Sequence, residues 1–160
     1  MSRTRPDPAT VVATIADPEM PELTLGDLGI VRRVMIDRDT VVVTITPTYS
    51  GCPATEVMVG EIERALHHAG WTDAHVHTAL SPPWTTEWIS AEGRAKLQRI
   101  GIGEPASMKA GWEQAVDAPV ACPQCGSRRT RRLGLFGSSA CREPYVCRAC
   151  METFERIKPI

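Results

Sequence analysis

The first predicted sheet is marked by short runs of β-branched residues. The runs 30–36 and 40–46 are rich in Val, Ile and Thr, and a three-residue polar link separates them. A link of this length between two such runs is typical of an antiparallel hairpin. The run 74–80 alternates small or apolar residues with two histidines, which predicts a third strand with one face in solvent.

The sequence also predicts three helices, which lie before, between and after these strands. The apolar residues after Pro53 recur at intervals of three and four, which predicts an amphipathic helix that packs on the sheet and ends at a glycine. Asp7 followed by a proline predicts a short helix that runs to about Ala16. A serine can cap a further helix over residues 91–99.

Four of the six cysteines form two Cys-x2-Cys pairs near the C-terminus. Cys122 and Cys125 form the first pair, Cys147 and Cys150 form the second, and 21 residues separate the pairs. Two such pairs supply the four thiolates of a closed, tetrahedral zinc site. Four cysteines can also hold an iron-sulfur cluster, but the spacing of a ribbon favours zinc. About forty residues are too few for a stable core, so we expect folding of this module to require the metal.

These patterns divide the chain into three parts. We expect an α+β domain with a small sheet and flanking helices over residues 7–100. The interval 101–119 is rich in glycine, proline and alanine without clear periodicity, which predicts a linker. A four-cysteine zinc ribbon over residues 120–160 completes the chain, with strands over 128–133 and 143–146.

Charge and composition separate the same parts. Before Ala118 the chain has 10 basic and 16 acidic residues, whereas 8 basic and 3 acidic residues follow. The four arginines at 128, 129, 131 and 132 divide between both faces of a strand, so an acidic protein partner fits them better than a nucleic acid. No apolar run is long enough to span a membrane, and no apolar segment of a signal peptide follows the N-terminal arginines. We therefore expect a cytoplasmic protein.

Cys52 is the only cysteine outside the C-terminal module. It lies between a predicted strand and helix, so we expect Pro53 to be the first helical residue and Cys52 the cap. The unpaired backbone donors at a helix N-terminus stabilise a thiolate, which makes the thiol a nucleophile or a soft-metal ligand. Thr48 and Glu56 should lie nearby and could position a ligand. The alternative is a buried cysteine that contributes only to packing; the same alternative applies to Cys141, which we leave unassigned.

Three short motifs carry a family resemblance. Asp17-Pro18-Glu19, Asp27-Leu28-Gly29 and Ser50-Gly51-Cys52-Pro53 resemble the SufT-like family of iron-sulfur assembly factors, over about residues 7–100. The segments 46–53, 80–88 and 136–141, together with the ribbon, are similar to the D-protein family of the phenylacetate degradation cluster. Together the two resemblances span nearly the whole chain.

The resemblance implies an accessory protein of the multicomponent oxygenase that epoxidises phenylacetyl-CoA, serving maturation of its metal centres. It places a site at Asp17, Glu19, Asp27, Thr48 and Cys52. The chain lacks the Glu-x-x-His pairs of a di-iron bundle and the glycine-rich fingerprint of a dinucleotide-binding reductase. We therefore expect no enzyme, although thiol chemistry at Cys52 stays open.

The resulting hypothesis gives the two cysteine sites different tasks. Cys52 transiently ligates iron or an iron-sulfur cluster, and the ribbon docks the oxygenase or its ferredoxin-like reductase. One thiolate cannot hold a cluster alone, so a second protomer in a homodimer, a small thiol or the client must supply further ligands. Three alternatives remain: an adaptor without metal chemistry, a thiol-disulfide enzyme, and a nucleic-acid-binding ribbon.

Overall fold

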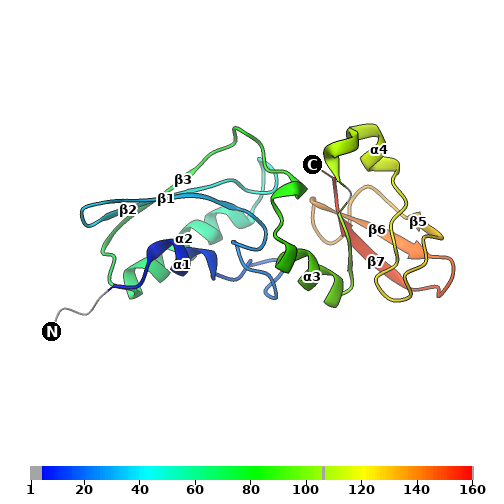
Figure 1. The fold of residues 1–160 in the computed structure, drawn as a ribbon, viewed down its shortest axis with the longest axis horizontal. Coiled ribbons are helices and arrows are strands. Elements are labelled where there is room, and N and C mark those ends of the chain that lie inside the picture. Colours follow the sequence, from blue (N-terminus) through cyan, green and yellow to red (C-terminus); the bar gives the residue numbers. More distant parts are fainter. Residues whose placement is uncertain (1–4, 106, 160) are drawn as a thin grey trace. The chain divides into compact units, whose positions relative to one another are not determined.

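The computed structural model describes residues 5–105 and 107–159, and the chain divides into two units, residues 1–84 and 85–160. Figure 1 traces both units from blue to red. Each unit combines helices with its own small sheet, which confirms the predicted α+β class. None of the helices in the described ranges is long and apolar enough to cross a membrane.

The first unit contains the predicted three-stranded sheet. Strands β1 (Val31–Asp37) and β2 (Thr40–Ile45) pair antiparallel, and β2 pairs parallel with β3 (Asp73–Thr78). Their bounds differ by one or two residues from the predicted runs. The hairpin link shortens to two residues because Asp37 pairs with Thr40 and Arg38 takes a left-handed conformation with φ of 56°.

Helix α2 (Ala54–His68) connects the parallel strands β2 and β3 and covers one face of the sheet (Figure 1). Strand β2 alternates buried and half-buried residues, so one row of its side chains enters the core. The chain turns after α2 at Gly70, whose φ of 92° favours glycine. The core of this unit consists of fully buried aliphatic side chains: Val12, Leu23, Leu25, Leu28, Ile30, Val41, Val43, Ile45, Met58, Ile62 and Leu66.

Helix α1 (Pro8–Ala13) is shorter than the predicted helix. It begins as expected, because the Asp7 carboxylate accepts a hydrogen bond from the Thr10 N–H at 3.0 Å. It ends three residues before Ala16, which instead forms a β-bridge with Thr24. This bridge joins two segments of the following loop, a tertiary contact that helical periodicity cannot report.

The second unit holds a four-stranded sheet in the order β4-β7-β6-β5. Its elements are η1 (Thr86–Trp88), α3 (Ala91–Arg99), β4 (Ile102–Gly103), η2 (Met108–Ala110), α4 (Trp112–Asp117), β5 (Thr130–Arg132), β6 (Arg142–Cys147) and β7 (Thr153–Ile157). The serine cap of α3 is confirmed, since the Ser90 hydroxyl accepts the Gly93 N–H at 2.9 Å. Strands β5 and β6 lie where the ribbon strands were predicted, but β7 has no counterpart in the prediction.

The interval 101–119 contains regular structure that its sequence pattern does not indicate. Strand β4 pairs parallel with β7, and η2 and α4 follow it. Gly103 allows close packing there, because a Cβ atom would lie 3.0 Å from the Phe154 ring and 3.1 Å from Val120, and these side chains would have to shift to accept it. A two-residue strand carries no periodicity, and its partner lies about fifty residues away in sequence, so local patterns cannot reveal it. The predicted boundaries of the domains and of the linker stay predictions.

A mixed core stabilises the second unit. Val120, Cys122, Tyr145, Cys147 and Phe154 form a buried cluster, and the rings of Tyr145 and Phe154 stack with centroids 5.7 Å apart. Beside this cluster the buried Arg156 guanidinium donates to the buried Glu143 carboxylate, with Nε 2.9 Å from Oε1. This core therefore combines aromatic packing, thiols and an ion pair.

Candidate functional site

The four ribbon cysteines converge on one point. The sulfur atoms of Cys122, Cys125, Cys147 and Cys150 all lie within 4.8 Å of one another. The Cys122 and Cys150 sulfurs are 3.7 Å apart, and those of Cys125 and Cys147 are 3.6 Å apart. A tetrahedral zinc ion with bonds of about 2.3 Å to sulfur separates its ligands by about 3.8 Å. The spacing of the sulfurs therefore fits a tetrahedral metal ion.

Both cysteine pairs lie on turns of the same kind. The Gly126 N–H donates to the Cys122 carbonyl at 2.8 Å, and the Met151 N–H donates to the Cys147 carbonyl at 2.9 Å. Gly126 and Met151, one after each pair, have positive φ values of 74° and 65°. Each turn thus directs two sulfurs to one side, and β6 and β7 bring the second turn opposite the first.

The backbone around Cys147 favours a thiolate. The N–H of Cys150 donates to its sulfur, and so does the N–H of Ala149 at 3.4 Å. These hydrogen bonds lower the pKa of Cys147 to about 6. The N–H of Glu152 lowers the pKa of Cys150, but burial and hydrogen bonds with the other three sulfurs outweigh it and raise this pKa to about 12. The metal-free cluster therefore favours a thiolate at Cys147 and a thiol at Cys150, and metal binding must displace the remaining proton.

Cys52 lies in the turn before α2, one position further from the helix than predicted. Pro53 is the N-cap, the helix begins at Ala54, and the Thr55 N–H donates to the Cys52 carbonyl at 3.1 Å. The thiol is half-buried, in contrast to the buried Cys141. Cys52 nonetheless remains at the helix N-terminus, where backbone donors and the helix dipole favour an anion.

The two predicted aspartates hold the backbone of their own loops. Asp17 Oδ1 accepts the N–H groups of Glu19 and Met20 at 2.9 and 2.8 Å. Asp27 Oδ2 accepts the Thr24 N–H at 2.9 Å, while the Thr24 hydroxyl accepts the Asp27 N–H at 3.0 Å. Both aspartates are buried. Their local contribution is therefore to shape the loops between α1 and β1.

The predicted set around Cys52 forms no closed metal site. Thr48 and Glu19 are half-buried, and Glu56 is exposed in the first turn of α2. Within the described ranges, the ribbon cysteines form the one group in which three or more Cys, His, Asp or Glu ligand atoms approach closely. A metal ion bound by Cys52 must therefore receive further ligands from outside the predicted set of Asp17, Glu19, Asp27, Thr48 and Glu56.

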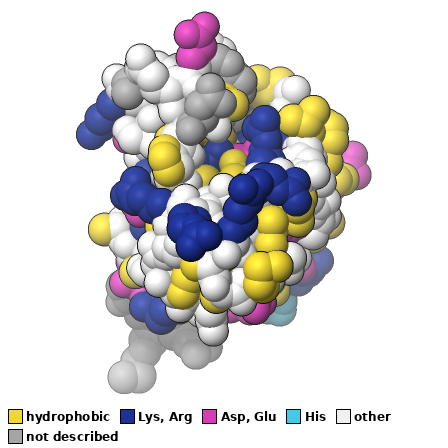
Figure 2. Space-filling view, turned by 90° about the vertical axis from the view of Figure 1, so that its right-hand side faces the viewer, with side chains coloured by type: hydrophobic (Ala, Val, Ile, Leu, Met, Phe, Trp, Pro, Cys, Tyr) yellow, Lys and Arg dark blue, Asp and Glu magenta, His cyan; other side chains and the backbone are white. Residues whose placement is uncertain are grey.

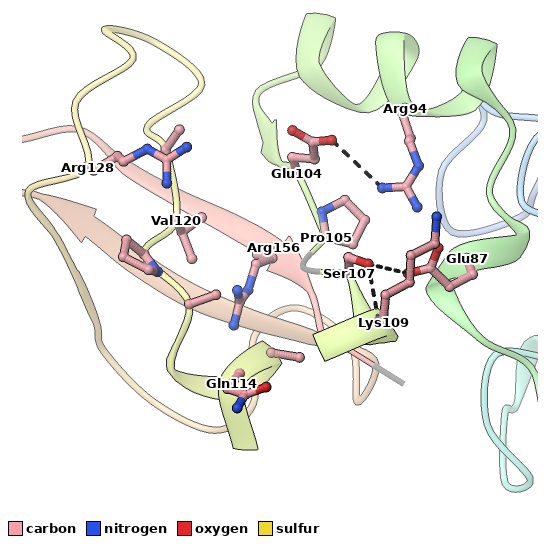
Figure 3. Close-up of a pocket in the computed structure, with 14 residues that line it drawn as sticks. Glu87, Arg94, Glu104, Pro105, Ser107, Lys109, Gln114, Val120, Arg128 and Arg156 are labelled. Atoms are coloured by element: carbon pink, nitrogen blue, oxygen red, sulfur yellow. Dashed lines mark hydrogen bonds and ion pairs between the residues drawn. The ribbon is translucent and has the colours of Figure 1, made fainter. Parts of the chain in front are cut away.

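Sequence reasoning did not foresee a cavity of about 610 Å³ in the second unit. Figure 3 shows its charged lining, which comes from segments far apart in sequence: Glu87, Arg94, Glu104, Lys109, Arg128 and Arg156. Arg94 lies 3.8 Å from Glu104, and Glu87 accepts hydrogen bonds from the Ser107 hydroxyl and the Met108 N–H. The Ser107 bond is the main cause that lowers the pKa of Glu87. Arg94 is thus paired within the lining and Arg156 pairs with Glu143 outside it, so these charged groups act in the packing of the second unit.

Two protein families match successive parts of the chain. Residues 9–78 match the family described as iron-sulfur cluster assembly protein, and residues 108–158 match the PaaD zinc beta ribbon domain. A protein of Escherichia coli (strain K12) named as the D component of 1,2-phenylacetyl-CoA epoxidase is 41% identical over 94% of this chain and 90% of its own length. An Fe-S protein maturation auxiliary factor of Bacillus subtilis (strain 168) is 33% identical over 52% of this chain and 82% of its own length.

Solved structures resemble the first part of the chain. A domain of unknown function, DUF59, from Bacillus anthracis aligns with a TM-score of 0.53 at 26% identity, covering 56% of this chain and 87% of that domain. A conserved hypothetical protein from Thermotoga maritima aligns with a TM-score of 0.50 at 31% identity, covering 61% and 98%. The expected family resemblance is therefore confirmed in both parts of the chain.

Proposed function

Because the chain belongs to the family of the D components of 1,2-phenylacetyl-CoA epoxidase, we propose that it is an accessory factor that matures this epoxidase. The protein assists assembly of iron or iron-sulfur clusters in the oxygenase or its ferredoxin-like reductase. Cys52 is the transient ligand of that cargo, and the zinc ribbon docks the client. The protein acts in the cytoplasm and does not itself turn over the aromatic substrate.

The contrast between the two cysteine sites carries this proposal. The ribbon offers four converging sulfurs, which leave no open position on a tetrahedral ion and suit permanent, structural zinc. Cys52 offers one half-buried thiol at the start of α2, in the part of the chain that matches the iron-sulfur assembly family. A site with one thiolate binds cargo weakly and releases it easily, as delivery requires.

The supporting residues around Cys52 have distinct tasks in this proposal. The buried Asp17 and Asp27 fix the loops before β1 through the backbone bonds described above. Glu19, Thr48 and Glu56 supply oxygen atoms that assist iron as it enters or leaves. A client residue, a small thiol or the Cys52 of a second protomer completes the coordination shell.

Two other functions make different demands on Cys52. A pure adaptor binds the client but needs no thiol at this position. A thiol-disulfide enzyme needs the thiol and shows turnover with a disulfide substrate. The match to the iron-sulfur assembly family over residues 9–78 favours cluster maturation over both.

The test measures metal content and client maturation together. Protein purified without oxygen is analysed for zinc, iron and acid-labile sulfide, comparing the wild type with Cys52→Ala and with Cys141→Ala. We expect zinc in all three, iron and sulfide lost with Cys52→Ala alone, and epoxidase components that stay poor in iron when matured with that variant. Cys141→Ala is the matched control because Cys141 is a cysteine outside both sites. If the Cys52→Ala variant matured the epoxidase components normally, the proposed role of the thiol would be refuted, and the adaptor function would remain.

A further inference from the structure

The loop after β5 exposes three large apolar side chains. Leu133, Leu135 and Phe136 are 46%, 61% and 70% exposed. Neighbouring apolar side chains in solvent are typical of surfaces that bind another macromolecule. Neither the zinc site nor Cys52 uses these residues, so the proposed chemistry does not explain their exposure.

This loop is held in place by polar contacts. The Gly137 N–H donates to the Arg142 carbonyl at 2.9 Å, and the Ser138 N–H and hydroxyl both donate to the Glu155 carboxylate. Lys158 Nζ donates to the Ala140 carbonyl at 2.7 Å. These hydrogen bonds tie the loop to β6, β7 and Lys158, while its apolar side chains stay in solvent. A surface ordered before binding loses less conformational entropy when a partner docks.

A groove lies beside these apolar side chains. Leu135 and Phe136 line a cavity of about 300 Å³ together with Val116 of α4 and Pro159. The remaining lining residues are Arg132, Glu143 and Lys158, and Lys158 Nζ lies 4.0 Å from the centre of the Phe136 ring. The Glu143 carboxylate is already occupied by Arg156, Arg132 and the Tyr145 hydroxyl. The groove therefore combines apolar side chains with the cationic groups of Arg132 and Lys158.

Further positive charge extends from the groove along β5. Arg128, Arg129, Arg131 and Arg148 are exposed, and none forms an ion pair with another described residue. Figure 2 shows Lys and Arg side chains gathered on one face of the molecule, with apolar side chains among them. A partner that covers this face must be acidic to be complementary in charge.

We propose that Leu133, Leu135, Phe136 and the groove beside them form the docking surface for an acidic protein, which inserts an apolar side chain into the groove. The exposed Arg131 attracts that protein at longer range. The identification of this acidic protein as a component of the epoxidase rests on the proposed function. A nucleic acid would complement the arginines but leaves the apolar groove without an occupant. An acidic protein accounts for both features.

The test measures binding to the purified oxygenase and to the purified reductase. The double variant Leu135→Ser, Phe136→Ser should weaken the affinity about tenfold or more, because buried anchors dominate interface energetics. Arg131→Glu should mainly slow association, and salt should reduce that difference. Ile36→Ser is the control, since Ile36 is an apolar side chain of comparable exposure, 52%, in the first unit. Zinc content and thermal unfolding check that each variant folds.

The possible results separate the docking surface from the proposed function. If the Leu135, Phe136 double variant bound with wild-type affinity, the proposed docking surface would be wrong. If Cys52→Ala still blocked iron loading in that case, the proposed function would stand. No binding of the wild type to either component would overturn the assignment of the partner. Binding of the wild type to a DNA or RNA oligonucleotide, lost with Arg131→Glu but kept by the double variant, would assign the face to nucleic acid instead.

Discussion

The two units of the chain are stabilised by different physical means. The first buries an aliphatic core that includes Leu28, Ile45 and Ile62, all fully buried. The second buries a small aromatic and thiol cluster beside the ion pair between Glu143 and Arg156. Burial of aliphatic surface stabilises a fold without any ligand. Converging thiols stabilise a fold when a metal binds them, so we expect the second unit to depend on a metal ion that the first unit does not use.

The same contrast applies to chemistry. The four ribbon sulfurs are brought together by two turns and two strands, which makes a permanent structural site. Cys52 lies in the turn between β2 and α2, in the unit whose core is aliphatic. A reactive or transient ligand is best placed on a scaffold whose stability does not depend on it. The division into two units therefore separates the expected structural metal of the ribbon from the metal that the protein is proposed to deliver.

Removal of the zinc should have the largest effect on folding, and it should unfold only the second unit. Structural zinc contributes on the order of 10 kcal/mol to folding of small metal-dependent modules. A strong chelator under reducing conditions should therefore collapse the amide resonances of β5, β6 and β7 while those of α2 and β1 to β3 stay dispersed. Two-dimensional NMR spectra measure both at once. Ile62→Ala should show the reverse, with the first unit destabilised and the zinc retained. A metal-free protein whose ribbon resonances stay dispersed would contradict the dependence on metal.

The buried ion pair should have the next largest effect. Glu143→Gln leaves the buried Arg156 guanidinium without its charged partner, which costs about 3–5 kcal/mol. The exposed pair between Glu92 and Arg99 is the matched control, and Glu92→Gln should cost only about 0–1 kcal/mol. Urea unfolding of the zinc-loaded protein, followed through the second unit, gives both values. Equal costs for the two variants would show that burial adds nothing to the pair.

The Tyr145 hydroxyl offers a spectroscopic readout of the same network. Its burial raises the pKa of Tyr145 to about 12, with Glu143 adding to the increase and Arg156 opposing it. Glu143→Gln should therefore lower this pKa, which ultraviolet titration of tyrosinate measures. An unchanged titration in that variant would mean that Glu143 does not act on the phenol.

The smallest effect is expected at the start of α1 in the first unit. Hydrogen bonds from the Thr10 hydroxyl and N–H lower the pKa of Asp7 below its ordinary value of 3.8. A lowered pKa in the folded state stabilises the protein above that ordinary value, and the stabilisation is lost as the pH falls through the lowered pKa. Asp7→Ala should therefore reduce the melting temperature slightly near neutral pH and leave it unchanged in strong acid. An equal difference at both pH values would contradict a contribution from the charged cap.

Local patterns were sufficient for several elements whose neighbours in sequence are also neighbours in space. The hairpin, α2 and the cap at Ser90 follow from periodicity and turn chemistry, and each was confirmed. Strand β7 was not predicted although it pairs with the adjacent β6, whereas β4 was not predicted because its partner β7 lies about fifty residues away in sequence. The early end of α1 was missed for the same reason, since the bridge between Ala16 and Thr24 decides it.

The candidate sites also differ in how much of each could be predicted from local sequence patterns. Sequence spacing alone predicted the four ribbon ligands, because each Cys-x2-Cys turn fixes two sulfurs locally, and the structure brings all four together. Sequence also predicted a thiol at a helix N-terminus, although the helix begins one residue later than expected. The roles of Asp17, Glu19, Asp27, Thr48 and Glu56 toward Cys52 stay predictions.

The sequence by itself determined the α+β class, the strands and main helix of the first unit, the family and the metal-ligand pattern. Each of these is encoded in short stretches, where side-chain periodicity, turn residues and ligand spacing act over one or two turns of chain. Only the tertiary structure decided the four-stranded sheet of the second unit, the buried pair of Glu143 and Arg156, and the groove beside Leu135 and Phe136. Those features arise when distant segments meet, because burial, charge pairing and exposure are properties of the packed chain.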